Sequence, residues 1–487
     1  MYNTKFSRRA FVTQTTAACS ALGFPVIIPA RVIGAGAPSK KIQVGVIGCG
    51  RIANGMDIPG IWRNKDMASL VALSDCDTRR MEATAKKVKN LFDSDLPQLK
   101  LYQNYTDLIK DPAVDAVMIC SPDFWHAQIA IDAALAGKDV YVQKPLAMTI
   151  YESRCIVEIM KKTGKIFHLG TQQRSEGPGT FGPQFRKAAE FVRNGRLGKI
   201  KRIEVGLPQD PKEPDSWPLT QMSPATFNYD VWLGQTPVAD YCELRTHPQG
   251  HDDKVSFGRP GWMTIQNYSM GMISNWGAHH IDIAQWGLGM EASGPIHIEG
   301  NADFPKRRLW NVHGKLDVKM KYADGAVLHV ADVSQYPNGV RFVGEDGWIF
   351  CSRGSAKATK DIASAGGKHG RWRPLETSDE KLIEGEVEQK LCRNKDHHRV
   401  WFESIHSRKP TNVLPETAHR TTSACILAYT AMNLKRPLTW NPVTELFVDD
   451  KEANSTISRV ERAPYGVCNT LKNHGVHIPQ NFGCCRI

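Results

Sequence analysis

The fold predicted for this chain is decided by residues 42–53, which read IQVGVIGCGRIA. The first six form a short apolar run, typical of a buried parallel strand. Glycines follow at once in the pattern G-x-G-x-x-G/A. Gly48 permits a tight turn, Gly50 lets a pyrophosphate approach the backbone, and the small Ala53 permits close packing of a helix on the strand. The N–H groups at the start of that helix would hold the phosphates.

A carboxylate stands where such a site needs one. A second apolar run, 70–73, is followed by Ser74 and Asp75, about twenty residues after the glycines, where an acidic residue binds the ribose hydroxyls. A carboxylate there favours NAD, because it would repel a 2′-phosphate, although Arg79 and Arg80 could accommodate NADP. The predicted cofactor-binding residues of this part are Gly48, Gly50, Arg51, Ile52 and Asp75.

Strand and helix patterns alternate over residues 41–165. Buried strands are predicted at 70–73, 116–120 and 140–142, and helices at 81–90, 127–136 and 151–162. Such alternation predicts a parallel, doubly wound sheet with helices on both faces. We therefore assign this part to the α/β class, as a Rossmann domain.

Beyond residue 165 the pattern changes. Alternating segments flank Asp-Gly turns, with 316–322 facing 326–333 and 340–343 facing 348–351. They predict an α+β domain over 166–465, whose mostly antiparallel sheet has one exposed face and packs against helices at 400–407 and 421–433. Residues 206–261, rich in proline and polar residues, are predicted to form long active-site loops. Residues 466–487 are predicted to be a poorly ordered tail.

Residues 1–37 carry the features of an export signal. Ser7-Arg8-Arg9-Ala10-Phe11-Val12 resembles a twin-arginine motif, the apolar stretch 17–28 follows it, and Ala35-Gly36-Ala37 offers a cleavage site. A disordered basic tail is the alternative interpretation. The order of the features favours export to the periplasm. No later run reaches the ~18 apolar residues of a membrane span, so we predict no transmembrane anchor.

Composition narrows the possible partners. The formal net charge is +12, but the basic residues are scattered and show no zinc-finger spacing or aromatic–basic alternation, so we predict no nucleic-acid partner. The twelve cysteines include no CxxC pair, and no disulfide framework is predicted. No further ligands stand at suitable spacing from His279 and His280 or from His397 and His398, so no metal site is predicted.

Several further segments resemble the Gfo/Idh/MocA family, the relatives of glucose–fructose oxidoreductase and inositol dehydrogenase. Together with the glycine motif they cover roughly residues 41–465. They are Ser121-Pro122-Asp123-Phe124-Trp125-His126, Gln143-Lys144-Pro145-Leu146, Asn275-Trp276-Gly277-Ala278-His279-His280-Ile281-Asp282, Ser407-Arg408-Lys409-Pro410, His419-Arg420 and Trp440-Asn441-Pro442. The resemblance implies a Rossmann domain followed by a domain with a large open-faced sheet, which often mediates homo-oligomerisation in this family.

The resemblance also implies site residues. Lys144 matches the lysine of the family's Glu-Lys-Pro motif, which holds the nicotinamide ribose and the substrate hydroxyl. His279 matches the family's acid/base, so Lys144 and His279 are the predicted catalytic pair. Ser121 and His126 are predicted to contact the cofactor. The predicted substrate residues are Arg174, Trp232, Asn275 and Asp282.

Two residues depart from the family pattern. Asn275 stands where the family has an aspartate; it can orient an imidazole but cannot accept its proton. Gln143 replaces the glutamate before Lys144 and removes a negative charge. Both raise the prospect of reduced or redirected chemistry.

The leading hypothesis is hydride transfer between tightly bound NAD(P) and a ring hydroxyl of a sugar or glycoside. One alternative is a glycosidase or lyase that oxidises its sugar transiently. Another is a non-catalytic protein that binds a dinucleotide or a sugar, against which the retained Lys144 and His279 argue.

Overall fold

The computed structural model describes residues 41–92, 98–177, 180–218, 220–250, 254–306, 308–354, 356–357 and 371–476. The predicted export signal, 1–37, lies outside these residues. The glycine motif opens a six-stranded sheet, and every neighbouring pair of its strands is parallel, as predicted. Its order is β3-β2-β1-β4-β5-β6, so the strand order reverses between β1 and β4, where ligands bind in such sheets. The strands are β1 (Ile42–Ile47), β2 (Ala68–Ser74), β3 (Lys100–Tyr102), β4 (Ala116–Ile119), β5 (Asp139–Val142) and β6 (Phe167–Leu169).

Helices cover both faces of this sheet. Apolar cores lie on either side of it, one against α5 and α6 and the other against α2 and α3. The bounds of α6 follow from its ends: Thr149 and Glu152 form a capping box, and Gly164 ends the helix in a left-handed conformation. The elements are η1 (Ala53–Asp57), α2 (Ile58–Arg63), α3 (Thr78–Phe92), α4 (Tyr105–Lys110), α5 (His126–Leu135) and α6 (Ile150–Thr163).

The second sheet has nine strands in the order β15-β12-β11-β7-β10-β9-β8-β16-β17. Both predicted hairpins are confirmed, as β9–β10 and β11–β12. Only the β7–β10 pair is parallel, so the sheet is mostly antiparallel, as predicted. The strands are β7 (Ile200–Leu207), β8 (His297–Ala302), β9 (Leu316–Lys321), β10 (Val327–Asp332), β11 (Gly339–Gly344), β12 (Trp348–Cys351), β15 (Leu375–Thr377), β16 (Leu438–Asn441) and β17 (Leu446–Phe447); β13 (Ala356–Lys357) and β14 (Arg371–Trp372) form a separate pair.

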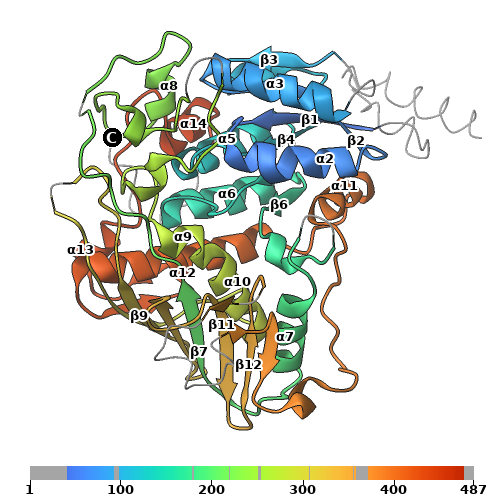
Figure 1. Cartoon of the computed structure of the whole chain (residues 1–487), viewed down its shortest axis with the longest axis vertical. Coiled ribbons are helices and arrows are strands. Elements are labelled where there is room, and N and C mark those ends of the chain that lie inside the picture. Colours follow the sequence, from blue (N-terminus) through green and yellow to red (C-terminus); the bar gives the residue numbers. More distant parts are fainter. Residues whose placement is uncertain are drawn as a thin grey trace, which may run out of the picture. The chain divides into compact units, whose positions relative to one another are not determined.

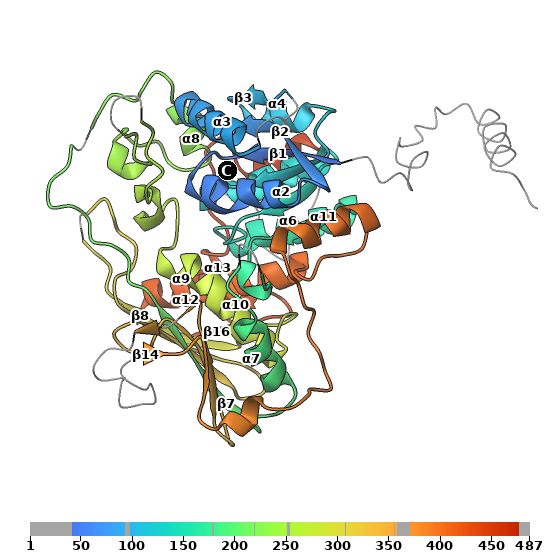
Figure 2. The ribbon, with the colours of Figure 1, turned by 45° about the vertical axis from the view of Figure 1, so that its right-hand side comes forward.

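One face of the nine-stranded sheet packs against helices. Figures 1 and 2 show α10 and α12 between this sheet and the Rossmann domain. Side chains of β9 alternate between buried and exposed, which gives the sheet an exposed face, as predicted. The helices of this part are α7 (Gln184–Arg193), α8 (Tyr229–Leu233), α9 (Met272–Asn275), α10 (Gly277–Leu288), α11 (His397–Ser407), α12 (Pro415–Leu434), α13 (Lys451–Asn454) and α14 (Val467–Asn473).

Segments beyond residue 165 return to the first domain. The Thr78 N–H donates to the Thr226 carbonyl, and the Trp125 indole donates to the Trp232 carbonyl at 3.0 Å. Figure 1 shows α8 and α14 beside the Rossmann elements. The expectation of a poorly ordered tail was therefore wrong for its first residues, since α14 packs on α5.

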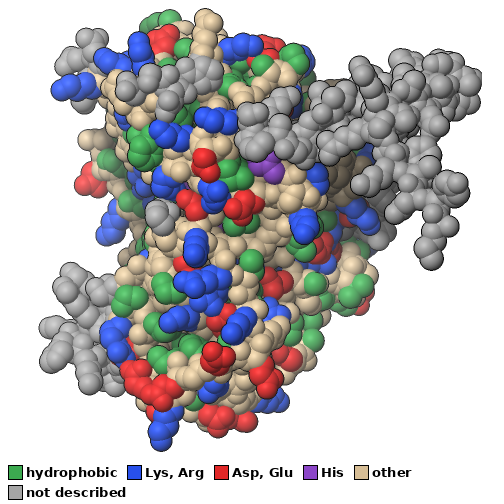
Figure 3. All heavy atoms as spheres, turned by 90° about the vertical axis from the view of Figure 1, so that its right-hand side faces the viewer, with side chains coloured by type: hydrophobic (Ala, Val, Ile, Leu, Met, Phe, Trp, Pro, Cys, Tyr) green, Lys and Arg blue, Asp and Glu red, His purple; other side chains and the backbone are tan. Residues whose placement is uncertain are grey.

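The surface carries both signs of charge. On the face seen in Figure 3, lysine and arginine side chains are interspersed with acidic ones. Within the described residues, no helix is both long and apolar enough to cross a bilayer. Eight of the described cysteines are free thiols, and Cys468 is disulfide-bonded.

Candidate active site

A cavity opens at the carboxyl ends of the parallel strands. Gly48 follows β1, Asp75 follows β2, Ser121 follows β4 and Lys144 follows β5, and all four line the cavity. Parallel strands that end together bring such residues together although they are distant in sequence. Other predicted site residues that line it are Gly50, Arg51, Ile52, His126, Trp232 and Asn275.

The glycine turn has the geometry that a dinucleotide requires. Gly48 has a φ of +92°, and a Cβ there would lie 2.7 Å from the backbone of Cys120, so no other residue fits. A Cβ on Gly50 would meet no protein atom within 4 Å, which leaves space for a ligand. Asp75 accepts hydrogen bonds from the backbone N–H groups of Cys49, at 2.7 Å, and Asp77, at 2.9 Å. The carboxylate is thereby fixed beside the turn, where a ribose would lie.

An unsatisfied polar atom also points to a cofactor. The Ser121 hydroxyl is buried and has no hydrogen-bond partner among the described residues, and Ser121 lines the cavity. A buried polar atom without a partner is costly, so this hydroxyl fits a polar ligand. Arg80 is partly committed elsewhere, because its Nη2 donates to the carbonyls of Pro248 and Ser256.

Lys144 and Asp123 are charged residues at the same cavity. Burial lowers the pKa of the Lys144 ammonium to about 8, an effect that Asp123 opposes and that Arg353, Arg51 and Arg259 reinforce. Burial raises the pKa of Asp123 to about 7, against the charge of Lys144. The two groups do not form a direct ion pair with each other, and both line the cavity.

Asn275 is connected to Asp123 by hydrogen bonds through Ser269. Its Nδ2 donates to the Ser269 Oγ at 3.2 Å, and the Ser269 hydroxyl donates to Asp123 at 2.9 Å. Among the described residues Asn275 makes no hydrogen bond to His279, so the orientation of an imidazole by this asparagine is not realised. Asn275 instead supports the serine that holds the buried carboxyl.

His126 connects the two loops that carry Ser121 and Lys144. Its Nδ1 lies 2.6 Å from the Pro145 carbonyl and its Nε2 lies 3.0 Å from the Ser121 carbonyl. Burial lowers the pKa of His126 to about 4, so the ring is neutral near pH 7 and can donate to one of these carbonyls. His126 therefore positions the loops, and its predicted contact with the cofactor stays a prediction.

His279 lies on α10 beside this site. It is buried, and its Nδ1 has no partner among the described residues. Burial lowers its pKa well below the usual value, and the charges of Arg353 and Lys144 lower it further. The ring is therefore neutral near pH 7, and protonating it is costly. The next residue, His280, contacts another part of the domain: its Nε2 lies 2.9 Å from the Asn338 side-chain oxygen.

Arg174 and Asp282 bind each other away from the cavity. The Arg174 guanidinium donates to both oxygens of Asp282, at 2.6 and 2.8 Å, and both side chains are 1% exposed. Arg174 also contacts Glu291. This arrangement favours a structural role, and the predicted contact of the two with substrate stays a prediction. Trp232 lines the cavity among aromatic rings, stacked on Tyr229 at 5.8 Å.

Comparison with protein families identifies the chain. The family model described as "Oxidoreductase family, NAD-binding Rossmann fold" matches residues 42–171, and the model of its C-terminal alpha/beta domain matches 217–356 and 338–467. The chain belongs to the Gfo/Idh/MocA family. The first sheet is thus the NAD-binding domain of this oxidoreductase family, and the second is its α/β domain.

Individual relatives agree with this assignment. The myo-inositol 2-dehydrogenase of Thermotoga maritima is 32% identical over 173 residues, which are 36% of this chain and 47% of that protein. The chain thus spans about half the length of the curated relatives it matches. An aldose-aldose oxidoreductase from Caulobacter crescentus has a TM-score of 0.57 at 16% identity, covering 82% of this chain and 100% of that one. A levoglucosan dehydrogenase has a TM-score of 0.55 at 14% identity, covering 84% and 100%. The last two show a shared fold.

The structure accounts for Gln143, which departs from the Gfo/Idh/MocA pattern. Its side-chain amide donates to both oxygens of the fully buried Asp57, at 3.0 and 2.8 Å, and His398 Nε2 lies 2.9 Å from the same carboxylate. A glutamate at position 143 would oppose Asp57 at this distance. In this chain the buried carboxylate is therefore that of Asp57, on η1, and not that of a residue at position 143.

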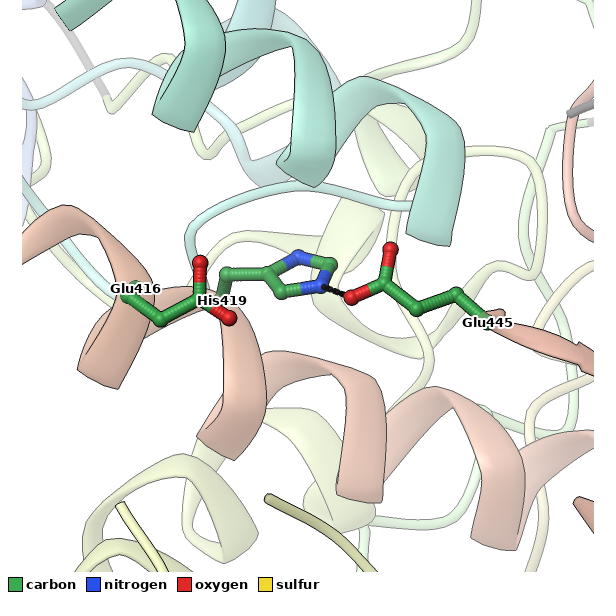
Figure 4. Close-up of side chains that lie close together, drawn as sticks. All are labelled: Glu416, His419 and Glu445. Atoms are coloured by element: carbon green, nitrogen blue, oxygen red, sulfur yellow. Dashed lines mark hydrogen bonds and ion pairs between the residues drawn. The ribbon is translucent and has the colours of Figure 1, made fainter. Parts of the chain in front are cut away.

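A second charged cluster lies on α12. Figure 4 shows the His419 ring directed at Glu445, with Glu416 on the same helix. The His419–Glu445 distance is 2.7 Å, and these three side chains are close enough to hold a cation. Arg154 and Arg420, however, form ion pairs with both glutamates. The cluster therefore joins α6, α12 and the turn before β17 as an ion-pair network.

Two residues of the site were missed by sequence reasoning. Asp123 stands in a loop noted for its resemblance to the Gfo/Idh/MocA family, but only Ser121 and His126 were assigned there. Arg353 follows β12 in the second domain. Its position beside His279 depends on the packing of distant segments, and no local pattern marks it.

Proposed function

We propose that this chain is an NAD-dependent oxidoreductase that oxidises a ring hydroxyl of a sugar or glycoside. One observation carries the proposal. Lys144 and Asp123 line the cavity that begins at the glycine turn, and they do not form a direct ion pair with each other. Their pKa values, about 8 and about 7, lie near neutrality, where groups that exchange protons work best. Such perturbed pairs mark functional sites.

The chain's own residues divide the work. Lys144 donates a hydrogen bond to the substrate hydroxyl and lowers its pKa, and Asp123 accepts the proton as the carbonyl forms. His279, neutral near pH 7, accepts a hydrogen bond from the substrate. A dinucleotide held at the glycine turn and Asp75 would supply the acceptor for the hydride that leaves the carbinol carbon. NAD rather than NADP is favoured, because the carboxylate of Asp75 lines the cavity and would repel a 2′-phosphate.

The cofactor is proposed to be tightly held. Residues 231, 232, 247, 258, 260, 262 and 263 line the cavity opposite the Rossmann residues. His247 binds Asp77 at 2.9 Å, and Arg80 Nη2 donates to the carbonyls of Pro248 and Ser256. Release of a dinucleotide would require this cover to move.

We further propose that the protein is exported by the twin-arginine route and acts in the periplasm. Free NAD should be scarce there, so a held cofactor must be regenerated in place, either by a second substrate or by return of the hydride to the same sugar. The second course is that of a glycosidase or lyase, and the proposed tight binding of the cofactor favours keeping this candidate. The exposed face of the nine-stranded sheet is the proposed surface for homo-oligomerisation.

The test starts from purified protein. A native mass spectrum should show bound NAD, and a panel of inositols, aldoses and glycosides should include a substrate that changes absorbance at 340 nm. K144A should still bind NAD through the glycine turn and Asp75, but it should lose at least tenfold in rate. Failure of every compound with NAD bound, or full activity of K144A, would contradict the proposal.

Export and cofactor regeneration have separate tests. R8K/R9K should leave the protein in the cytoplasm, and normal export of this double variant would contradict the predicted twin-arginine signal. With no added NAD, turnover should continue well past one equivalent of enzyme. A burst of one equivalent that resumes only with fresh NAD would identify an ordinary dissociating dehydrogenase.

A further inference from the structure

Arg353 is held in one orientation beside the proposed reaction site. Its guanidinium lies between two aromatic rings, 4.0 Å from the centroid of Phe181 and 4.3 Å from that of Trp276. Its Nε donates to the Gln173 side-chain oxygen at 3.0 Å. Stacking on both faces leaves only the edge of the planar group for further contacts.

Among the described residues, this arginine has no counter-ion. Its Nη2 is buried without a hydrogen-bond partner, and within the described residues no carboxylate forms an ion pair with it. Burial alone lowers its pKa to about 10. Arg174 offers the contrast, because that more deeply buried guanidinium is bound by Asp282 and Glu291. A partly buried charge without a partner is costly, so the site fits an anion that arrives with a ligand.

The unpaired charge acts on the reacting groups. Arg353 is the largest charge effect on His279 after burial, and it also lowers the pKa of Lys144. Trp276, which stacks on Arg353, stands three residues before His279 on the chain. On the Lys144 side, Asp123 is the carboxylate that opposes these cations. The substrate side of the site therefore has a surplus of positive charge.

We propose that Arg353 binds a carboxylate of the substrate, so that the sugar oxidised at Lys144 is a sugar acid that keeps its ring, such as a uronic acid. This inference rests on the proposed function, because it places a sugar at Lys144 and His279. The guanidinium edge matches a carboxylate in charge and in planar geometry. A phosphate ester shares this chemistry but carries a second negative charge, for which Arg353 alone offers no partner.

The test measures equilibrium binding to the NAD-loaded protein by calorimetry. The probes are matched pairs: D-glucuronate with D-glucose and with its neutral methyl ester, and D-galacturonate with D-galactose. D-Glucose 6-phosphate is a separate arm. Hydrogen bonds to charged groups change Kd by roughly tenfold to a hundredfold. We expect at least one acid to bind tenfold more tightly than its neutral counterpart.

Variants assign that preference to Arg353. In R353Q the preference should fall below twofold, whereas R353K should keep part of it. The control, R373Q, removes an exposed arginine of the same domain that pairs with Glu380, and it should bind like the wild type. A wild type without acid preference, a preference that survives in R353Q, or tighter Arg353-dependent binding of the phosphate would each overturn the inference.

Absorbance at 340 nm in the same mixtures separates the two proposals. Tight, Arg353-dependent binding of an acid without hydride transfer from any sugar would overturn the proposed function but leave the anion site standing. Hydride transfer from neutral sugars, with no preference for acids, would overturn only the anion site.

Discussion

Replacing Asp123 by asparagine should separate the activity of this protein from its stability. The amide keeps an acceptor for the Ser269 hydroxyl, which donates to Asp123 at 2.9 Å, but it cannot take a proton. General-base catalysis contributes typically ~10²–10⁴-fold, so the rate at pH 8 should fall by about that factor. NAD binding should not change, because the glycine turn and Asp75 are untouched.

Stability should move the other way. The pKa of Asp123 is raised from 3.8 to about 7, a difference of roughly 4 kcal/mol between its two protonation states. A carboxyl whose pKa rises on folding destabilises the folded protein above its ordinary pKa, because the folded state holds the proton more tightly than the unfolded chain. The cost begins near pH 3.8 and is complete above pH 7. D123N should therefore gain up to about 4 kcal/mol at pH 8, reduced by the part of the Lys144 charge left without a partner.

The assay compares melting temperatures and pH–rate profiles of the NAD-loaded wild type, D123N and D132N. Asp132 is a matched control, since its pKa is also raised by burial, but it lies on α5 and accepts a hydrogen bond from the Tyr105 hydroxyl on α4 at 2.6 Å. The wild-type rate should fall as pH drops through 7, and D123N should lack this limb. A D123N rate within threefold of the wild type, or an unchanged limb near pH 7, would refute the role of Asp123.

Three further variants test separate parts of the site. G50V should fold, because a Cβ there meets no protein atom within 4 Å, but should lose NAD affinity at least a hundredfold by fluorescence titration; unchanged occupancy would remove the turn from the cofactor site. Q143E sets a second carboxylate against Asp57. The free energy of unfolding in denaturant should fall by about 3 kcal/mol at pH 8 and by less at pH 5, because protonation of one carboxylate relieves the repulsion. An equal loss at both pH values would contradict the charge argument. R174A leaves Asp282 buried without its partner and should cost about 3–5 kcal/mol; unchanged stability with lost sugar affinity would favour the substrate role instead.

Much of the fold could be predicted because its signals are local. The apolar run before Gly48 and the alternating segments around Asp-Gly turns each specify an element within a few residues. β7 was not predicted: it carries Lys201, Arg202 and Glu204, which interrupt its apolar pattern, and its central place comes from pairing with β10 and β11.

The site was only partly predictable for the same reason. Gly48, Asp75 and Lys144 stand at strand ends, where the sequence itself indicates a ligand. Asp123 is held by the hydroxyl of Ser269, and the guanidinium of Arg353 is held by the ring of Trp276. These contacts join segments that are distant in sequence, so no local sequence pattern predicts them. The sequence indicates only that Gln143 removes a negative charge, and the structure shows that the carboxylate of Asp57 lies beside its amide.

The central claim, hydride transfer from a sugar to NAD held in this cavity, is tested most directly by following the hydrogen itself. The protein with its bound dinucleotide would be mixed in a single turnover with the best-binding sugar, deuterated at its carbinol carbons. The account predicts a rise in absorbance at 340 nm, slower for the deuterated sugar, and a mass spectrum in which the reduced dinucleotide carries one deuterium, with both signals strongly diminished in K144A. A saturated complex that holds NAD and the sugar but yields no labelled NADH would contradict it.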